Sequence, residues 1–186
     1  MKEILSQSII IIGTLHDKWT PVNELRDTLN ELNPDKVLIE LSKEELRDRP
    51  REDSIRDEMF AAYDWAIENS KQVDVFDVEV STLKKGVTGK ELNFIKLENK
   101  VKKLLKEYSW KDLNNLKPWN ISEVTELEDK IVEKYFDKDK MREREFKMLN
   151  NLNKLIIDGK NVIIIGTGHL TFFQEQIPDA KLIFRK

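Results

Sequence analysis

Two segments far apart in the chain share one pattern, and this pattern constrains the fold more than any other feature. They read SIIIIGTLH, from Ser8 to His16, and NVIIIGTGH, from Asn161 to His169. A β-branched run that stops at a glycine is typical of a buried strand followed by a tight turn. Each histidine then follows the carboxyl end of its strand, the edge where ligands bind in open α/β sheets. We therefore expect the two histidines, the only ones in the chain, to share a functional site. The alternative is two structural histidines, each hydrogen-bonded to the backbone of its own turn.

Composition narrows the class of protein. A length of 186 residues fits a single domain with a real core, which we assign to residues 1–186. The charged residues make up 36% of the chain, are interspersed and leave a net charge of only -3, so no basic surface for nucleic acid is expected. The chain has no cysteine, which excludes disulfides, thiolate metal sites and cysteine nucleophiles. No signal peptide is evident and no apolar run approaches the roughly 20 residues of a membrane helix, so we expect a cytoplasmic protein that does not bind membranes.

Strands alternate with helices along the chain. Strands are predicted at Gln7–Ile12, Lys36–Leu41, Gln72–Val78, Val162–Ile165 and Lys181–Phe184. Helices are predicted at Pro21–Leu32, Ser54–Ile67, Leu92–Tyr108, Ile121–Tyr135, Lys140–Ile157 and Leu170–Gln176, with a break at Trp110–Pro118. This alternation predicts an α/β fold with a mostly parallel central sheet and flanking helices.

A helical insertion, at about residues 92–135, separates the third and fourth strands. Because it contains no strand pattern, we expect it to cap the carboxyl edge of the sheet or to form a lobe beside it. A lid over the site is one interpretation of this insertion. The other interpretation is an appendage that stabilises the domain or forms a dimer contact, in which case the protein is a homo-oligomer.

Glu40 and Arg47 follow the second predicted strand, in KVLIELSKEELR. Glu40 ends a strand that otherwise looks buried, in the same layer as the two histidines. A buried, unpaired carboxylate costs several kcal/mol, so Glu40 needs a metal, an arginine or a set of hydrogen-bond donors. The alternative is a solvent-exposed strand end. Arg47 is a candidate to pair with a carboxylate or to bind an anionic group. The alternative is that it belongs to a solvated cluster of arginines with no such role.

The helix MREREFKMLNNLNKLII contains a violation of its own pattern. Its apolar stripe is formed by Met141, Met148, Leu149, Leu152, Leu155 and Ile156. On a helical wheel Glu145 falls near the middle of this stripe and Arg144 at its margin. Polar residues on a core-facing arc tend to mark functional sites. The alternative is a structural ion pair between Glu145 and Arg144 or Arg142.

These motifs together resemble the TraB/PrgY family, which is related to the Tiki proteins and to the broader group of erythromycin esterases and ChaN-like proteins. The similar segments are GTLH, PDKVLIELSKEELR, EREFKM and VIIIGTGHL, in the family's order and spacing over nearly the whole chain. Glu145 stands where the family motif has aspartate, and Val78 stands where it has an arginine after Asp77. The resemblance therefore assigns no role to Asp77.

Two hydrolytic mechanisms fit these residues. In the first, His16, His169 and Glu40 hold a divalent metal (Mn, Co or Zn) and leave an open position, as catalytic sites do. The metal lowers the pKa of bound water, Glu145 acts as acid or base, and Arg144 holds the substrate or stabilises the oxyanion. The resemblance to the Tiki proteins, described as metal-dependent peptidases, also implies this metal-dependent mechanism. In the second, which the erythromycin-esterase relatives imply, a histidine is the general base on water without a metal.

The expected substrate is a small peptide or another small molecule with an amide-like bond, and we expect Gly13, Gly166 and Arg47 to contribute to its binding. No GxSxG elbow or similar nucleophile motif is present. A non-catalytic protein that binds a peptide or ligand is the remaining alternative, since PrgY-like relatives are associated with reduced pheromone activity and ChaN-like relatives with haem. Haem fits poorly, because a chain with two histidines at one site has no spare ligand.

Overall fold

The computed structural model describes residues 8–15, 20–49, 57–87, 92–105, 108–115 and 122–183. Of the predicted site residues, His16 lies outside these ranges. The ends of four predicted elements, at Gln7, Ser54, Ile121 and Phe184, and the predicted stop at Pro118 lie outside them as well.

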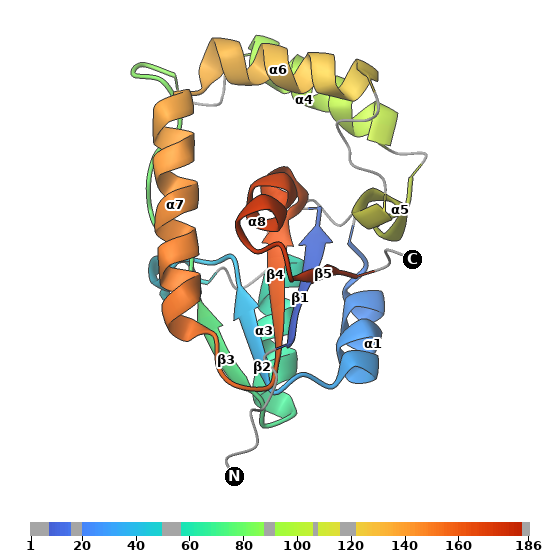
Figure 1. Cartoon of the computed structure of the whole chain (residues 1–186). Helices are drawn as coiled ribbons and strands as arrows, with labels where there is room; N and C mark the ends of the chain where they lie inside the picture. The colour runs from blue at the N-terminus through green and yellow to red at the C-terminus, as the bar shows by residue number, and fades with distance from the viewer. Residues whose placement is uncertain are drawn as a thin grey trace.

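Five parallel strands form one sheet in the order β3-β2-β4-β1-β5 (Figure 1). The strands are β1 (Ser8–Thr14), β2 (Lys36–Ile39), β3 (Gln72–Val75), β4 (Lys160–Gly166) and β5 (Lys181–Leu182). The predicted α/β class is confirmed. The two strands that lead into the GTxH segments lie side by side, with Ser8 opposite Lys160 and Thr14 opposite Gly166.

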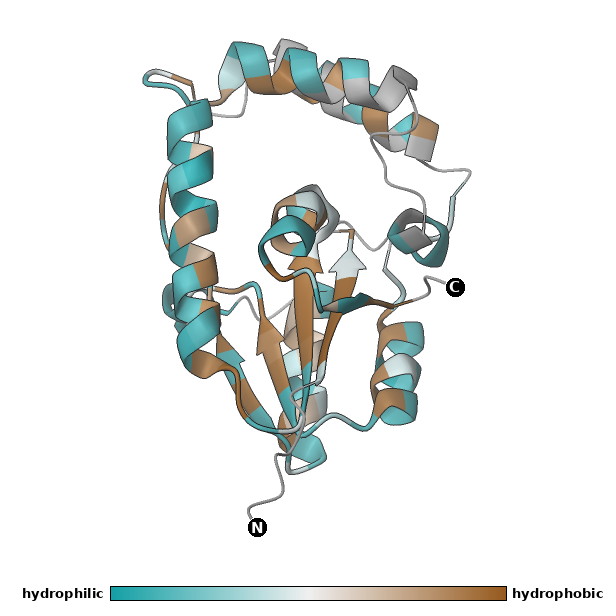
Figure 2. Ribbon diagram, in the orientation of Figure 1, coloured by the Kyte–Doolittle hydropathy of each residue, from teal (hydrophilic) through white to brown (hydrophobic). Residues whose placement is uncertain are grey.

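The isoleucine runs are apolar throughout because both faces of the sheet are covered. Alternate side chains point to opposite faces, so Ile12 and Ile164 belong to one core cluster and Ile11 and Ile163 to the other. All four side chains are fully buried. Figure 2 shows these strands as the continuously hydrophobic centre of the molecule.

One pair of helices covers each face. Leu25 and Leu29 of α1 (Val22–Leu32) and Met59 of α3 (Asp57–Glu68) pack in the cluster that contains Ile12. The opposite cluster, with Ile11, receives Met148 and Leu152 of α7 (Lys138–Leu155) and Phe173 of α8 (Leu170–Gln176). Strands and helices agree with the sequence prediction to within a few residues at their ends, and the predicted bounds of α8 are met.

The insertion contains α4 (Leu92–Leu105), α5 (Trp110–Asn115) and α6 (Ser122–Tyr135). Helices α4 and α6 pack on each other beyond the carboxyl edge of the sheet, and α7 leads back from there along the sheet (Figure 1). A small separate cluster around Ile131 and Tyr135 stabilises this layer.

The predicted break at Trp110–Pro118 is wrong over Trp110–Asn115, where the chain forms α5. Ser109 starts this helix: its hydroxyl accepts from the backbone N–H of Asp112 at 3.1 Å, and its own N–H donates to the Asp112 carboxylate at 2.9 Å. Trp110 is buried in the core cluster of α1 and α3. The cap and this tertiary anchor favour a helix that apolar periodicity did not indicate.

A further helix was not predicted from the sequence. Helix α2 (Lys43–Arg47) begins directly after the second strand, at a capping box formed by Ser42 and Glu45. The Ser42 hydroxyl accepts from the N–H of Glu45 at 3.0 Å, and the Glu45 carboxylate accepts from the N–H of Ser42 at 2.8 Å. The chain thus turns away from the sheet immediately after Glu40 and Leu41.

Within the described ranges, no helix combines the length and the apolar character that a membrane crossing requires.

Replacement of Leu152 tests how α7 is held to the sheet. Leu152 is fully buried between α7 and the sheet, so Leu152→Ala should lower the free energy of unfolding by about 2–5 kcal/mol. Lys147→Ala, on the exposed side of the same helix, is the matched control and should change it by less than about 0.5 kcal/mol. Urea-induced unfolding measures both values, and equal effects of the two changes would contradict this packing.

Candidate functional site

The carboxyl ends of β2 and β4 are joined through a buried carboxylate. Glu40 directly follows β2, and its backbone N–H continues the ladder by donating to the carbonyl of Ile164 at 2.9 Å. Its side chain turns toward β4, where one oxygen, Oε2, accepts from the N–H of Gly166 at 2.6 Å. Because Glu40 is only 2% exposed, this hydrogen bond to the end of β4 fixes the carboxylate at the edge of the sheet.

The sheet topology favours a site at this place. The chain leaves β1 and β2 toward helices on one face, α1 and α3, and it leaves β4 toward α8 on the other face. Between such strands the connections diverge, and ligands of open α/β sheets bind at this divergence. Strand β4 lies between β1 and β2, so its carboxyl end is the centre of the candidate site.

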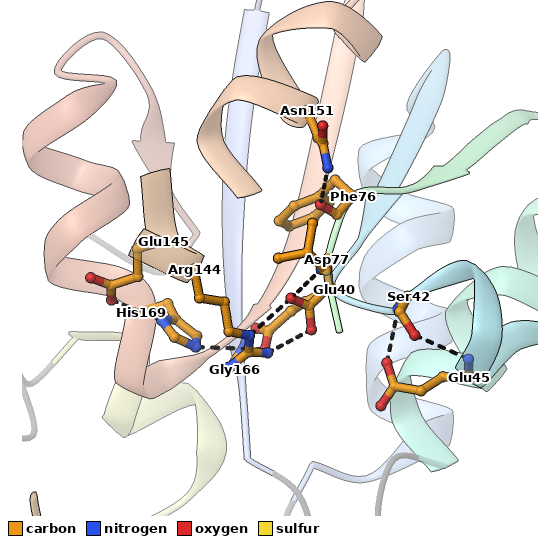
Figure 3. Close-up of polar contacts among 11 residues, drawn as sticks. Glu40, Ser42, Glu45, Phe76, Asp77, Arg144, Glu145, Asn151, Gly166 and His169 are labelled. Carbon is orange, nitrogen blue, oxygen red and sulfur yellow. Dashed lines mark hydrogen bonds and ion pairs between the residues drawn. The ribbon is translucent and has the colours of Figure 1, made fainter. Parts of the chain in front are cut away.

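Arg144 of α7 reaches into this edge and bridges two carboxylates (Figure 3). Its Nε and Nη2 atoms donate to the two oxygens of Asp77 at 3.0 and 2.5 Å, and Nη2 also lies 3.3 Å from Oε1 of Glu40. Both carboxylate side chains are 3% exposed and the arginine side chain is 17% exposed. This bidentate pairing satisfies buried charges that neither strand end could hold alone.

His169 lies between Glu145 and Glu40 (Figure 3). Its Nδ1 is 2.9 Å from Oε1 of Glu145, and its Nε2 is 3.7 Å from Oε1 of Glu40. The histidine ends a short 3₁₀ turn, Thr167–His169, between β4 and α8. Glu40, Asp77, Arg144, Glu145 and His169 therefore form one contiguous group, called the His169 cluster below.

The charges of the cluster change the ionisation of the imidazole. Burial lowers the pKa of His169, but the charge of Glu40 and the hydrogen bond to Glu145 raise it, and the balance leaves the pKa above its ordinary value of 6.5. The positive charge of Arg144 opposes this increase. The His169 ring therefore keeps its proton to a higher pH than a free imidazole does, and its charge depends on the carboxylates and the guanidinium beside it.

The carboxyl end of β1 lies beside the cluster and is held by other polar groups. The side-chain amide of Asn114, in α5, bonds both the N–H and the carbonyl of Gly13 at 2.6 Å. The Thr14 hydroxyl lies 3.4 Å from Oε1 of Glu58, and the N–H of Leu15 donates to the hydroxyl of Thr20 at 2.8 Å. These contacts lead up to His16, which lies outside the described residues.

The structure brings together five of the predicted site residues. Glu40, Arg144 and His169 meet in the cluster with Glu145, and Gly166 donates its N–H to Glu40. Arg144 and Glu145 do not pair with each other. They take separate partners, Asp77 and His169, from the inward side of α7.

Two other predicted residues, Arg47 and Gly13, have their partners outside this group. The Arg47 side chain is 69% exposed and pairs with the adjacent Asp48 at 2.8 Å, which raises the pKa of its guanidinium and lowers that of the Asp48 carboxyl. Gly13 lies at the end of β1 with both backbone groups bonded to Asn114.

Asp77 and Asn114 are the two members of this region that sequence reasoning missed. A signal for Asp77 exists: like Glu40, it is the first acidic residue after the end of its strand, β3, and it directly follows the buried Phe76. Asn114 gave no comparable signal, because its role depends on a tertiary contact to a residue 101 positions earlier.

The donor set of the cluster differs from what a divalent metal requires. A histidine whose Nδ1 donates to a carboxylate presents Nε2 to a metal in many sites. Here, however, the nearest second donor, Oε1 of Glu40, also lies 3.3 Å from the Arg144 guanidinium, whose charge opposes a divalent cation. No three His, Asp or Glu side chains of the described ranges are arranged to hold an ion. These residues therefore do not fit a metal site by themselves, and His16, the third predicted ligand, lies outside them.

No protein-family model, curated protein or solved structure matches this chain.

Removal of the guanidinium tests the buried ion pairs. Arg144→Met leaves the carboxylates of Glu40 and Asp77 buried without this cation, so the free energy of unfolding should fall by about 3 kcal/mol or more. Adding Asp77→Asn to Arg144→Met should cost less than the sum of the two single changes, because the two side chains interact directly. Arg142→Met, on the exposed side of α7, is the control. Strict additivity of Arg144→Met and Asp77→Asn in denaturant unfolding would contradict the pairing.

The raised pKa of His169 predicts a pH dependence of stability. A group whose pKa is higher in the folded state stabilises the fold fully below its unfolded value, near 6.5, and this contribution disappears as pH rises through the folded pKa. The free energy of unfolding of the native protein, minus that of His169→Gln, should therefore decrease as pH rises from 6 to 9. A difference that increases over this interval would show that burial, which lowers the pKa, is the stronger effect.

Proposed function

We propose that this protein is a hydrolase in which His169, oriented by Glu145, activates a water molecule against an ester or amide-like bond. The observation that carries the proposal is the 2.9 Å contact between Nδ1 of His169 and Oε1 of Glu145. Both side chains are largely buried, at 17% and 18% exposed, so the ring is held in one orientation in a place of reduced solvation.

The chemistry follows from which nitrogen carries the proton. With Nδ1–H donated to Glu145, the neutral ring has its lone pair on Nε2. Nε2 takes a proton from water as the water oxygen attacks the substrate carbonyl carbon, and Glu145 stabilises the imidazolium that forms. As the tetrahedral intermediate collapses, the bond to the leaving group breaks and the proton on Nε2 passes to that group.

Arg144 and Glu40 supply the electrostatic surroundings of this reaction. The Arg144 guanidinium, fixed by two bonds to Asp77, provides a positive charge toward which an oxyanion can develop. Glu40, held by Gly166 and Arg144, adds to the basicity of the ring through its negative charge. No serine or cysteine nucleophile is required.

The family assignment is part of the same proposal. The GTLH, VLIEL, ERE and GTGH segments resemble the motifs of the TraB/PrgY family, and three of the four contribute side chains to the cluster. The mechanism proposed here corresponds to the one that the erythromycin-esterase relatives imply. A small peptide or another small molecule is the expected substrate.

A metal-dependent hydrolase is the second candidate. The specific observation in its favour is the contact of Nδ1 with a carboxylate, which leaves Nε2 as a nitrogen donor of the kind that Zn, Mn or Co binds. His16 would then be a further ligand. The charge of Arg144 beside Glu40 is the reason that we place this candidate second.

Turnover of a library of peptides and esters tests the proposal. His169→Ala should lower kcat/KM by about 10²–10⁴-fold, the usual contribution of general-base catalysis. Glu145→Gln should lower kcat because it removes the charge that stabilises the imidazolium. Lys147→Ala, on the exposed side of α7, is the control and should leave the rate unchanged.

The pH profile and metal removal separate the candidates. For a histidine base, kcat/KM should increase with pH to a plateau above the raised pKa of His169, and protein treated with a chelator and verified as metal-free should retain its activity. Loss of activity on chelation with recovery on adding Mn, Co or Zn would favour the metal-dependent candidate. Tight peptide binding without any turnover would instead support a binding protein.

A further inference from the structure

The side chain of Asn114 makes a two-point contact with the backbone of Gly13. Its Oδ1 accepts from the Gly13 N–H, and its Nδ2 donates to the Gly13 carbonyl, both at 2.6 Å. Asn114 is 3% exposed. An amide in the opposite orientation would place oxygen against oxygen, so the pairing itself fixes which end of the side chain faces which group.

This contact pairs the edge of β1 beyond the end of its neighbouring strand, β5. On the side of β1 away from β4, β5 pairs with Ile10 and Ile11, and the last backbone hydrogen bond runs from the N–H of Ile183 to the carbonyl of Ile11 at 3.0 Å. Gly13 is the next residue of β1 whose N–H and carbonyl face the same side. Asn114 supplies one donor and one acceptor there, so the edge of β1 stays paired to the residue before Thr14.

Gly13 also contacts the start of α8, next to His169. A Cβ atom on Gly13 would lie 2.6 Å from Cδ1 of Leu170 and 3.0 Å from Oδ1 of Asn114. The Leu170 side chain and the Asn114 amide therefore both pack closely against Gly13, in the space that a side chain at this position would need. Leu170 directly follows His169 and is buried, so the position of Gly13 bears on the position of the imidazole.

Helix α5 holds Asn114 in this place. Nδ2 of Asn114 donates a second bond to the carbonyl of Trp110, at 2.9 Å. The Trp110 ring is buried in the core against α1, and its Nε1 lies 3.2 Å from a carboxylate oxygen of Glu24. The amide is thus tied to the main core through a short helix of the insertion.

We propose that Asn114 is a positioning residue for the His169 cluster. By pairing the carboxyl end of β1, it sets the surface on which Leu170 packs and through it the setting of His169, so the insertion contributes to the site. The role in turnover rests on the proposed function, but the role in placing the imidazole does not.

The chain offers a matched control in Asn161. This asparagine is also buried, and its side chain also bonds a backbone N–H and a backbone carbonyl, both of Ile157, at 3.1 and 2.8 Å. It lies at the opposite, amino edge of the sheet, near the start of β4. Asn114→Ala and Asn161→Ala therefore remove the same kind of contact at the two ends of the sheet.

The experiment is a comparison of the two variants in the full chain by NMR and turnover. In Asn114→Ala, the amide exchange of Gly13 should accelerate, the imidazole signals and titration of His169 should shift, and turnover should fall by about 10²-fold, as expected for a misplaced catalytic group. Asn161→Ala should leave these His169 signals in place and retain turnover, even if both variants lose similar stability. A His16→Asn background identifies the His169 signals.

Three outcomes would overturn the proposal. One is accelerated exchange at Gly13 with unchanged His169 signals, and another is the same shift in both variants, which would reflect general loosening. The third is a Gly13 amide that exchanges freely in the native protein. If Asn114→Ala does not fold, Asn114→Asp, which keeps the shape of the side chain and loses the donor, replaces it in the comparison. If no substrate is turned over, the proposed function fails while the NMR comparison still decides the role of Asn114.

Discussion

The Arg144 guanidinium lies between the carboxylates of Glu40 and Asp77, and the arrangement of the candidate site depends on these ion pairs. Glu40 follows β2, Asp77 follows β3 and Arg144 comes from α7, so one side chain connects two strand ends to a helix on one face of the sheet. Because both carboxylates are almost fully buried, this connection has a large energetic consequence if it is broken. Arg144 directly precedes Glu145 on α7, so the helix that carries this ion pair also carries the contact of Glu145 with His169.

The topology determines where these groups meet. Strand β4 is central, and the chain turns from it to the face opposite to the helices that follow β1 and β2. His169 is carried on the 3₁₀ turn at this divergence. Burial lowers the pKa of the imidazole, but Glu40 and Glu145 beside it outweigh this effect and raise the pKa above its ordinary value. The hydrogen bonds between Asn114 and the backbone of Gly13 connect the carboxyl end of β1 to the helical insertion. The surroundings of the site therefore include residues of the sheet and of the insertion.

Local patterns predicted much of this from the sequence. The apolar runs of β1 and β4 predicted parallel, buried strands, and the acidic residue in the apolar stripe of α7 singled out Glu145, which the structure places on His169. Glu40 was found because a carboxylate at a buried strand end needs a partner. The partners themselves were less predictable: Asp77 pairs with an arginine 67 positions later and Asn114 with a glycine 101 positions earlier. Helix α5 was missed because a cap and a buried tryptophan stabilise it, and six residues are too few for a periodic signal.

Glu145 holds the proton of His169 on Nδ1 in the proposed mechanism, and this leaves Nε2 to exchange protons. The most direct measurement is the ¹⁵N NMR spectrum of the imidazole of His169 above its pKa, which distinguishes the two neutral tautomers. We expect the Nδ1–H form, with Nε2 as the nitrogen that titrates, and a shift toward a mixture of tautomers in Glu145→Gln. A neutral ring protonated on Nε2 in the native protein would contradict it, because the nitrogen facing Glu145 would then be the base.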